Sequence, residues 1–166
     1  MKRVVIILAL LFLVGCTTGV ETMESGTYAV VDTNKGTFTI KLYEDTPITT
    51  NNFVKLAESK FYDDLTFHRY EPGFVIQGGD PKGDGTGGSD DTVNLEMVGK
   101  SHKKWTIGMA RSQDPNSASS QWFVNLADNT FLDSGYAVFG EIVEGTEVAA
   151  ELRVGDVMTS VKIEKI

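Results

Sequence analysis

The clearest pattern in this chain is an alternation of apolar and polar residues over residues 27–43. Phe38, Ile40 and Leu42 recur at every second position in its later half. A period of two puts alternate side chains on opposite faces of a strand, so each half predicts a half-buried β-strand. The Asn-Lys-Gly sequence at 34–36 favours a tight turn between them. The segment is therefore predicted to be a β-hairpin.

The spacing of apolar residues lengthens from two to about four in residues 47–58, which predicts an amphipathic helix. Thr46 stands where an N-cap is favoured, and Pro47 suits the first turn, where its missing N–H has no helical partner to lose. The residues at helical spacing on the predicted buried face are Ile48, Asn52, Phe53, Leu56 and Ala57. A second, shorter helix is expected around residues 146–152.

Short apolar runs recur along the rest of the chain, separated by loops of Gly, Asp, Asn and Ser. Runs of this length between turn residues are typical of β-strands. They cover residues 65–70, 73–77, 93–97, 105–110, 121–126, 136–142 and 157–163. Many short strands with only two helices predict a mainly β fold, a closed antiparallel β-barrel capped by two α-helices.

The first residues do not fit this fold and are typical of an export signal. Lys2 and Arg3 precede an uncharged apolar run at 4–14, which is the order found in secretory signals. The run is about eleven residues long, whereas a membrane-spanning helix needs roughly 20. It is therefore predicted to direct export without forming a membrane-spanning helix.

The end of this run, Leu-Val-Gly-Cys at 13–16, resembles the lipobox of prokaryotic lipoproteins. The resemblance implies cleavage after residue 15 and a lipid on Cys16, with residues 16–25 as a tether to an extracytoplasmic membrane surface. Cys16 is the only cysteine, so no intramolecular disulfide can form. The alternative is an ordinary secreted protein with a chance cysteine.

Length and charge limit what the remaining residues 26–166 can be. A chain of 166 residues, 41% of them apolar, suits one domain with an ordinary core. The net charge of −8 repels phosphate backbones, so nucleic acid is not expected as a partner.

Several kinds of catalytic or metal site find no support in the residues. The two histidines, His68 and His102, are not accompanied by a G-x-S-x-G nucleophile elbow or by clustered Cys ligands for zinc. The glycine-rich loop 78–91 lacks the P-loop pattern. It partly matches a calcium loop, with Asp80 at the first position, but Lys82 stands at the third. A flexible loop of turn residues is the preferred interpretation, and no metal or cofactor is expected.

Five stretches in the same order resemble the cyclophilin-type peptidyl-prolyl isomerases. They are FHRYEPGFVIQGGDP at 67–81, GTGG at 85–88, GMA at 108–110, SQWFVNLADNTFLD at 120–133 and YAVFGEIVEG at 136–145. The similarity extends from about Tyr28 to Ile163, nearly the whole predicted domain. It implies an eight-stranded antiparallel β-barrel with two helices. It also implies a peptidyl-prolyl cis-trans isomerase that acts on proline-containing polypeptides during the folding of exported proteins.

The resemblance also implies which residues form the active groove. Arg69, from the F-H-R stretch, and Gln77, before Gly-Gly-Asp, match the catalytic positions. The residues that match substrate-binding positions are Phe74, Val75, Ala110, Phe123, Phe131, Leu132 and Tyr136. The other large residues of these stretches, Trp122, Ile76 and Met109, are expected in the core.

Two of the groove positions differ from the eukaryotic pattern of the family. Phe131 stands where Trp is usual, and Tyr136 stands where His is usual. Bacterial-type members often have Phe and Tyr there, so the difference leaves catalysis intact and implies weak binding of the drug cyclosporin.

A different class of function uses the same groove. A non-catalytic module could hold proline-containing segments at the membrane surface with the same apolar pocket. Arg69 favours the enzyme, because pure binding needs no hydrogen-bond donor beside the rotating amide. In either case the protein is expected to be a monomer.

Overall fold

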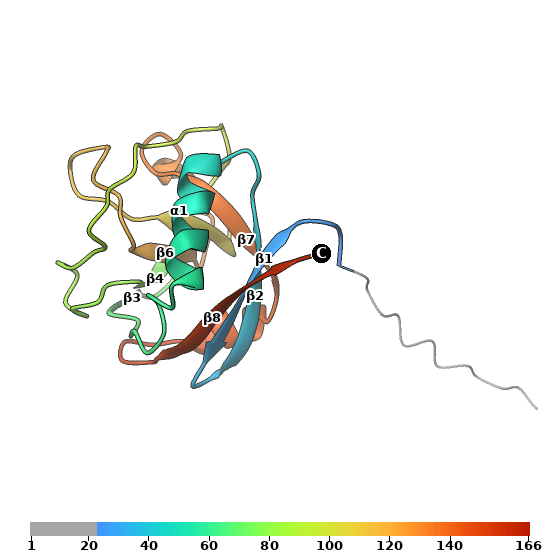
Figure 1. Cartoon of the computed structure of the whole chain (residues 1–166). Coiled ribbons are helices and arrows are strands. Elements are labelled where there is room, and N and C mark those ends of the chain that lie inside the picture. The colour runs from blue at the N-terminus through green and yellow to red at the C-terminus, as the bar shows by residue number, and fades with distance from the viewer. Residues whose placement is uncertain (1–22) are drawn as a thin grey trace, which may run out of the picture.

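The structure is a computed structural model that describes residues 23–166, so the predicted signal and Cys16 lie outside the described residues. Eight strands form one antiparallel sheet in the spatial order β3-β4-β6-β5-β7-β2-β1-β8 (Figure 1). The strands are β1 (Thr27–Thr33), β2 (Gly36–Leu42), β3 (Arg69–Glu71), β4 (Val75–Gly78), β5 (Thr106–Met109), β6 (Trp122–Asn125), β7 (Val138–Glu144) and β8 (Met158–Lys165).

The sheet is an open half-barrel, so the prediction of a closed barrel was wrong. β3 and β8 are its two edges, and among residues 23–166 the bridge near both is the isolated pair Thr66 and Val157. Backbone hydrogen bonds join the segment before β3 to residues at the very start of β8 and just before it, such as Met158 N–H to Leu65 O at 2.8 Å and Phe67 N–H to Asp156 O at 2.9 Å. β3 has only three residues, too few to pair along the length of β8. Alternation in a sequence assigns the faces of strands, and it does not say whether the last strand pairs with the first.

The hairpin prediction is confirmed. β1 and β2 pair antiparallel from Tyr28–Lys41 to Thr33–Gly36 around a two-residue loop. Gly36 has a φ of 129°, and a Cβ there would come 3.1 Å from a methyl of Val148.

The tether predicted to end at residue 25 already contacts this hairpin, because Glu24 forms an ion pair with Lys41 at 2.6 Å.

The first helix, α1 (Pro47–Glu58), has the predicted bounds. Its buried face includes Phe53, Leu56 and Ala57 as expected, whereas Ile48 is 47% exposed. The Thr46 side chain does not cap the helix. Glu96 does so instead, since its carboxylate accepts from the N–H groups of Ile48 at 3.2 Å and Thr49 at 2.9 Å. A carboxylate at this end also interacts favourably with the helix dipole.

The strand predicted at 93–97 is wrong, because this segment makes only the isolated bridge of Val93 to Ala118. Its Glu96 is instead used at the start of α1. The second helix is confirmed as α2 (Thr146–Glu151), one residue shorter than expected, and it packs on β2. A 3₁₀ turn, η1 (Thr130–Leu132), lies between β6 and β7.

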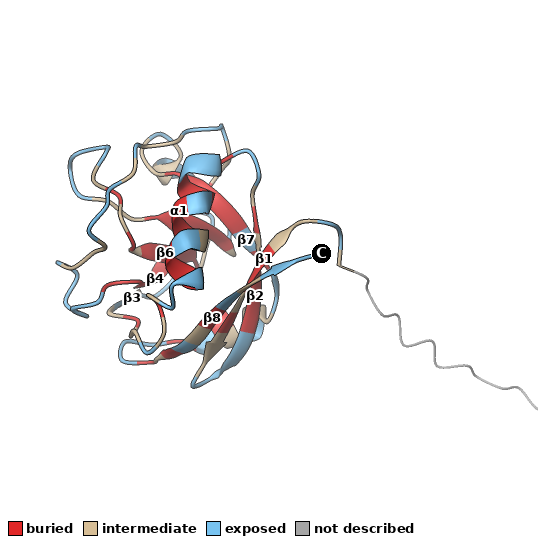
Figure 2. Cartoon of the chain, in the orientation of Figure 1, coloured by how far each residue is buried: buried red, intermediate tan, exposed pale blue. Residues whose placement is uncertain are grey.

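The core lies between α1 and the inner face of the sheet, where the helix packs on β7 and β8 (Figure 1). Buried residues follow the inward face of α1 and the middle of the strands (Figure 2). Phe53 is the centre of an aromatic cluster, with ring centroids 5.0 Å from Tyr62, 5.3 Å from Phe139 and 5.9 Å from Trp122. Trp122, Ile76 and Met109 are buried, as predicted.

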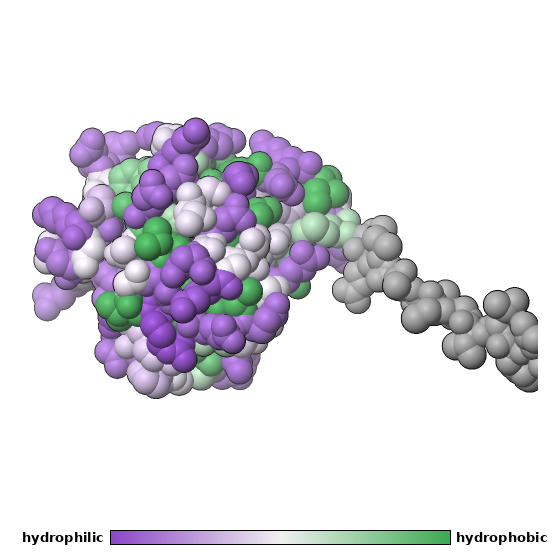
Figure 3. Space-filling model, turned by 90° about the horizontal axis from the view of Figure 1, so that it is seen from below, coloured by the Kyte–Doolittle hydropathy of each residue, from purple (hydrophilic) through white to green (hydrophobic). Residues whose placement is uncertain are grey.

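The outer surface is dominated by polar side chains on the face that Figure 3 shows, with apolar residues scattered between them. No helix among residues 23–166 has the length and apolar content needed to cross a membrane.

Candidate active site

The register of three neighbouring strands brings the predicted catalytic residues together. Arg69 in β3 pairs with Gln77 in β4, and Gln77 pairs with Phe123 in β6. Side chains of directly paired residues point to the same face of a sheet. Because the next residues along, Ile76 and Val124, are fully buried on the inner face, the row of Arg69, Gln77 and Phe123 lies on the opposite side.

Arg69 is held at this surface by weak contacts that leave most of its donors available. Its Nη1 donates to Gln77 Oε1 at 3.3 Å, and its Nε lies 3.7 Å from a carboxylate oxygen of Glu71. Both members of that ion pair are about half exposed, so the pair adds little stability. The guanidinium carbon is 5.7 Å from the centre of the Phe74 ring. A guanidinium has five N–H donors, so several can still turn towards a ligand.

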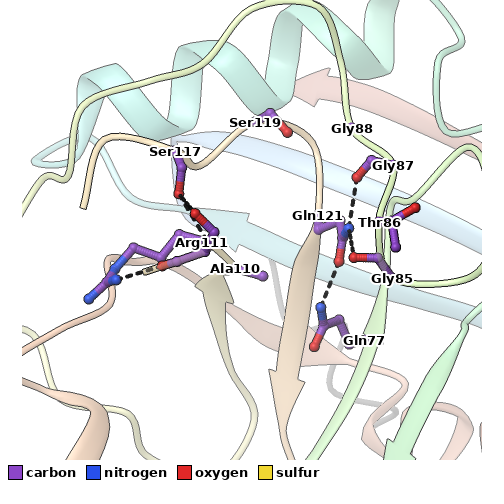
Figure 4. A pocket seen from close by; sticks show the side chains of 11 residues that line it. Gln77, Gly85, Thr86, Gly87, Gly88, Ala110, Arg111, Ser117, Ser119 and Gln121 are labelled. Carbon is purple, nitrogen blue, oxygen red and sulfur yellow. Dashed lines mark hydrogen bonds between the residues drawn. The ribbon is translucent and has the colours of Figure 1, made fainter. Parts of the chain in front are cut away.

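Gln77 is oriented by a second glutamine that the sequence analysis did not single out. Its Nε2 donates to Gln121 Oε1 at 2.7 Å. Gln121 in turn donates to the carbonyls of Gly85, at 3.0 Å, and Gly87, at 2.8 Å (Figure 4). This amide chain fixes which end of Gln77 is the donor, and so the Gln77 oxygen is left facing Arg69.

The loop that carries these glycines is itself built around Asp80, which is 1% exposed. Its carboxylate accepts from the N–H groups of Lys82 at 2.8 Å, Asp84 at 3.2 Å and Gly85 at 2.6 Å. Burial raises the pKa of Asp80, but the backbone N–H groups of Lys82, Gly85 and Gly87 together bring it below its ordinary value. Both carboxylate oxygens thus accept hydrogen bonds from backbone N–H groups, and Asp80 has a structural role in this loop. No three His, Cys, Asp or Glu side chains in residues 23–166 are grouped so as to hold a metal ion.

Beside Arg69 is a small pocket of about 160 Å³, called here the proline pocket after the ligand that the family resemblance predicts for it. Its lining contains eight of the nine residues predicted as catalytic or substrate-binding, together with Arg111. The lining residues are Arg69, Phe74, Val75, Gln77, Ala110, Arg111, Phe123, Leu132 and Tyr136. Val75 and Phe123 are nearly fully buried. The result is a hollow with apolar walls whose polar side chains are the guanidinium groups of Arg69 and Arg111 and the carboxamide of Gln77.

Phe131 is the one predicted substrate-binding residue outside the lining of the proline pocket. It lies in η1 with 70% of its surface exposed. Its ring stacks on that of Phe74, with the centroids 5.7 Å apart and an angle of 22° between the planes. The structure therefore places Phe131 on the rim, where it extends the apolar wall towards solvent.

Arg111 is a residue that the sequence analysis missed, although it directly follows the predicted Ala110. Its Nε donates to Gly135 O at 2.7 Å, and its guanidinium carbon lies 4.7 Å from the centre of the Tyr136 ring. Arg111 thus holds the segment that carries Tyr136 against the pocket. The sequence feature that could have pointed to Arg111 is its position directly after Ala110, between a buried strand and a polar loop.

A second hollow of about 330 Å³ adjoins the proline pocket and shares Gln77, Ala110 and Arg111 with it (Figure 4). Its other side is formed by the loop at 85–88 and by serines that follow Arg111. The two hollows form a continuous groove, apolar at one end and polar at the other. Such a groove suits an extended peptide with an apolar ring at one position.

Comparison with known proteins identifies the kind of groove. The family model described as cyclophilin type peptidyl-prolyl cis-trans isomerase/CLD matches residues 28–166. A peptidyl-prolyl cis-trans isomerase of Helicobacter pylori is 39% identical over 146 residues, which are 85% of this chain and 89% of the relative. Peptidyl-prolyl cis-trans isomerase B of Bacillus subtilis is 41% identical over 145 residues, or 86% and 99% of the two chains.

Solved structures show the same fold. The crystal structure of a Cryptosporidium parvum cyclophilin type peptidyl-prolyl cis-trans isomerase, in the presence of the dipeptide Ala-Pro, superposes with a TM-score of 0.79 at 26% identity. The match covers 84% of this chain and 99% of that one.

Proposed function

Because this chain belongs to the cyclophilin-type peptidyl-prolyl cis-trans isomerases and shares their activity, we propose that catalysis takes place in the proline pocket with Arg69 as the catalytic donor. Gln77 is the second polar group of the reaction. The observation that supports this most directly is the row formed by Arg69, Gln77 and Phe123 across three paired strands.

The reaction needs rotation about one bond and no bond cleavage. Resonance between the nitrogen lone pair and the carbonyl gives the peptide bond a barrier of about 18–20 kcal/mol. For a bond before proline both isomers are populated, yet they exchange in tens to hundreds of seconds. An enzyme accelerates the exchange if it binds the twisted amide more tightly than either planar form.

Arg69 is suited to this selectivity because the lone pair of the proline nitrogen becomes available to a donor only in the twisted amide. In the planar amide the nitrogen is not a hydrogen-bond acceptor, but at the twisted state it regains its lone pair and becomes one. A donor aimed at that nitrogen stabilises the twisted state alone. Arg69 lies beside the Phe74 ring at the mouth of the pocket, and its guanidinium has five N–H donors.

The apolar walls supply the second part of the effect. Phe74, Phe123 and Leu132, with Val75 beside them, would enclose the proline ring and exclude water. Water favours the charge-separated resonance form of the amide, so its removal weakens the resonance that opposes rotation. Gln77 would bond the substrate backbone and hold one half of the peptide while the other half turns.

Replacement of Arg69 tests this assignment. Arg69→Ala should lower kcat and kcat/KM by similar factors of a hundred or more, which is roughly 2.7 kcal/mol of transition-state stabilisation, with KM nearly unchanged. Arg69→Lys should restore only part, because an ammonium lacks the planar fork. The measurement is isomerisation of a proline tetrapeptide, with circular dichroism to verify folding.

Arg153 offers a matched control. It too is an arginine over an aromatic ring, 4.4 Å from the centre of Tyr70, but it does not line the proline pocket. Arg153→Ala should leave the rate unchanged. A folded Arg69→Ala protein as fast as the wild type would show that Arg69 is not the catalytic donor.

The non-catalytic docking module receives no support of its own. Relatives of about 40% identity over most of the chain are isomerases by name, and the groove contains the donor that binding alone does not need. Proline-containing segments remain the proposed ligands, now as substrates.

The enzyme is further proposed to act on exported proteins, as a monomer bound through Cys16 to an extracytoplasmic membrane surface. The charged start, apolar run and Cys16 of the sequence support this placement. A tether of about ten residues reaches at most about 35 Å when extended. The catalytic domain would then meet its substrates close to the membrane. Cyclosporin is expected to bind this groove weakly.

A further inference from the structure

Three buried polar side chains lie directly behind the proline pocket and are not part of its lining. His102 and Asn125 are fully buried, and Asn129 is 3% exposed. They come from the segment before β5, the end of β6 and the residue before η1. A buried polar group costs free energy unless it is hydrogen-bonded. Their partners therefore show what the three residues do.

The three side chains form one hydrogen-bonded chain between two walls of the pocket. Asn129 Nδ2 donates to the carbonyl of Phe74 at 2.9 Å and to Asn125 Oδ1 at 2.9 Å. Asn125 Nδ2 contacts His102 Nδ1 at 3.1 Å, and His102 Nε2 contacts the carbonyl of Tyr136 at 3.1 Å. The chain begins at the backbone of Phe74 and ends at the backbone of Tyr136, which lie on the lining of the same pocket.

The partners fix the direction of each bond. Asn125 Nδ2 also faces Thr106 O at 3.1 Å and Thr106 Oγ1 at 3.0 Å. The carbonyl can only accept, and the hydroxyl already donates to Lys103 O at 2.7 Å, so the Asn125 amide must present its nitrogen on this side. His102 Nδ1 is therefore an acceptor, and Nε2 carries the proton that it donates to Tyr136. A neutral imidazole with its proton on Nε2 satisfies both of the ring's own contacts.

The same imidazole supports the third wall by contact. It stacks on the Phe123 ring, with centroids 5.7 Å apart and an angle of 15° between the planes. The Tyr136 ring meets both at close to a right angle. Gly108 makes this arrangement possible, because a Cβ there would lie 2.6 Å from Phe123 Cε2 and 2.9 Å from His102 Cε1.

We propose that His102, with Asn125 and Asn129, is a positioning network that sets the width of the proline pocket by holding Phe74, Phe123 and Tyr136 at fixed separations. None of the three touches substrate. The inference depends on the proposed function only in that the proline ring binds in this pocket.

The width of the pocket matters because the pocket must hold the proline ring while the peptide bond before it is cis, trans or twisted between the two. A displacement of about 1 Å by a mutation away from the reacting atoms can cost about a hundredfold in rate. Apolar packing alone resists such movements weakly, since one aromatic ring can slide on another. Directional hydrogen bonds to two backbone carbonyls fix the walls more firmly.

The network works with the neutral ring only. Protonation of Nδ1 would turn an N–H of the ring towards the N–H of Asn125. Burial lowers the pKa of His102, against the opposing effects of the Tyr136 carbonyl and Asp133. Asp133 is the charged group that faces it, and it accepts from the His102 backbone N–H at 2.7 Å. The neutral state is thus maintained at neutral pH by the fold.

Two substitutions separate the hydrogen bonds from the stacking. His102→Phe keeps a ring against Phe123 but removes the acceptor for Asn125 Nδ2 on this side and the donor to Tyr136 O. It should raise KM and lower kcat/KM by about tenfold or more. His102→Gln restores one acceptor and one donor and should recover at least half of that loss on a logarithmic scale. Asn129→Ala removes one of the two hydrogen bonds to the Phe74 carbonyl and leaves the one from Leu126 N–H, and it should act in the same direction as His102→Phe.

Val31→Ala is the control for a merely structural effect. Val31 is fully buried in β1, away from the pocket lining, so its truncation should lower the melting temperature and leave kcat/KM unchanged. A folded His102→Phe protein with kcat/KM within twofold of the wild type would overturn the proposal. If Arg69→Ala is slow in that case, the proposed function stands and only the network is wrong.

Nitrogen-15 spectra of the wild-type imidazole test the network without any substitution. They should show the Nε2–H tautomer at pH 7, and the His102 signals should shift when a tetrapeptide with a central Ala-Pro bond saturates the enzyme. Observation of the Nδ1–H tautomer or of an imidazolium at pH 7, or signals unmoved by saturating peptide, would refute it even if the variants did not fold.

Discussion

Asp80 offers a test of how the glycine-rich loop supports the groove. In Asp80→Ala the carboxylate that accepts from Lys82, Asp84 and Gly85 is lost. A hydrogen bond to a charged group contributes about 1.5–3 kcal/mol, so the simple sum for three is roughly 5–9 kcal/mol. Residues 81–86 are exposed, however, and their freed N–H groups can bind water. We therefore expect a loss of about 2–3 kcal/mol in the free energy of unfolding.

The same substitution should reach the active site through the amide chain. The carbonyls of Gly85 and Gly87 hold Gln121, and Gln121 holds Gln77 beside Arg69. When the loop loosens, Gln77 is less well oriented, and kcat/KM should fall by about three- to tenfold. Urea denaturation and a proline tetrapeptide assay on the same protein measure both effects.

Asp91→Ala is the matched control from the same acidic segment. Asp91 forms an exposed ion pair with Lys55 at 2.9 Å, and its loss should change stability by less than about 1 kcal/mol. If Asp80→Ala were no less stable than Asp91→Ala, the carboxylate would not be organising the loop. A rise in wild-type melting temperature on addition of millimolar calcium would favour the calcium-loop interpretation instead.

The pH dependence of the Asp80 effect has a definite sign. The pKa of Asp80 in the folded protein is lowered below 3.8, so the folded state binds its proton less readily than the unfolded state. The stabilisation is therefore complete above about pH 5 and is lost as the pH falls through the folded pKa. The difference between wild type and Asp80→Ala should be constant from pH 8 to pH 5 and shrink below about pH 4.

Three further predictions concern the anchor, the rim and the histidines. Cys16→Ser should abolish incorporation of labelled fatty acid; continued labelling, or a wild type that never partitions into detergent, would contradict the anchor. Phe131→Trp should lower the cyclosporin inhibition constant about fivefold, because an indole N–H adds a bond of about 1 kcal/mol at an exposed rim position; an unchanged constant would show that this side chain does not meet the drug. Burial lowers the pKa of both His68 and His102, so the unfolded state takes up protons first and the free energy of unfolding should decrease from pH 7.5 to pH 5.5. In His102→Gln this decrease should be smaller, and a profile identical to the wild type would refute the assignment.

Most of the site could be predicted because its residues come from contiguous stretches with a distinctive order. Arg69 and Gln77 lie eight positions apart in one short hairpin, so the local sequence already implies that they are close. Phe123 joins them through the pairing of β4 with β6, which only the family resemblance could suggest. How far Phe131 is exposed, 70% of its surface, could not be predicted, since a sequence gives residue type and spacing but not exposure.

The features that sequence reasoning missed all depend on contacts between distant segments. Glu96 lies in an apolar run that resembled a strand, yet its carboxylate is used 47 positions away by the N–H of Thr49. The edge strands β3 and β8 do not pair with each other, and the alternation within each strand gives no sign of this. Hydrophobic periodicity reports which face of a segment is buried. It contains no information about which buried polar group finds which partner.

The two hydrogen-bonded chains approach the groove from opposite sides and have different tasks. The amide chain that ends at Gln77 lies on the exposed side, where it orients a polar group towards a substrate backbone that must move. The chain through His102 and Asn125 is buried and holds walls that must not move. Catalysis of a rotation requires both, because one half of the peptide has to be fixed while the other half turns. Loss of the exposed chain should therefore affect mainly kcat, whereas loss of the buried chain should affect mainly KM. This contrast distinguishes the two tasks in a single series of kinetic measurements.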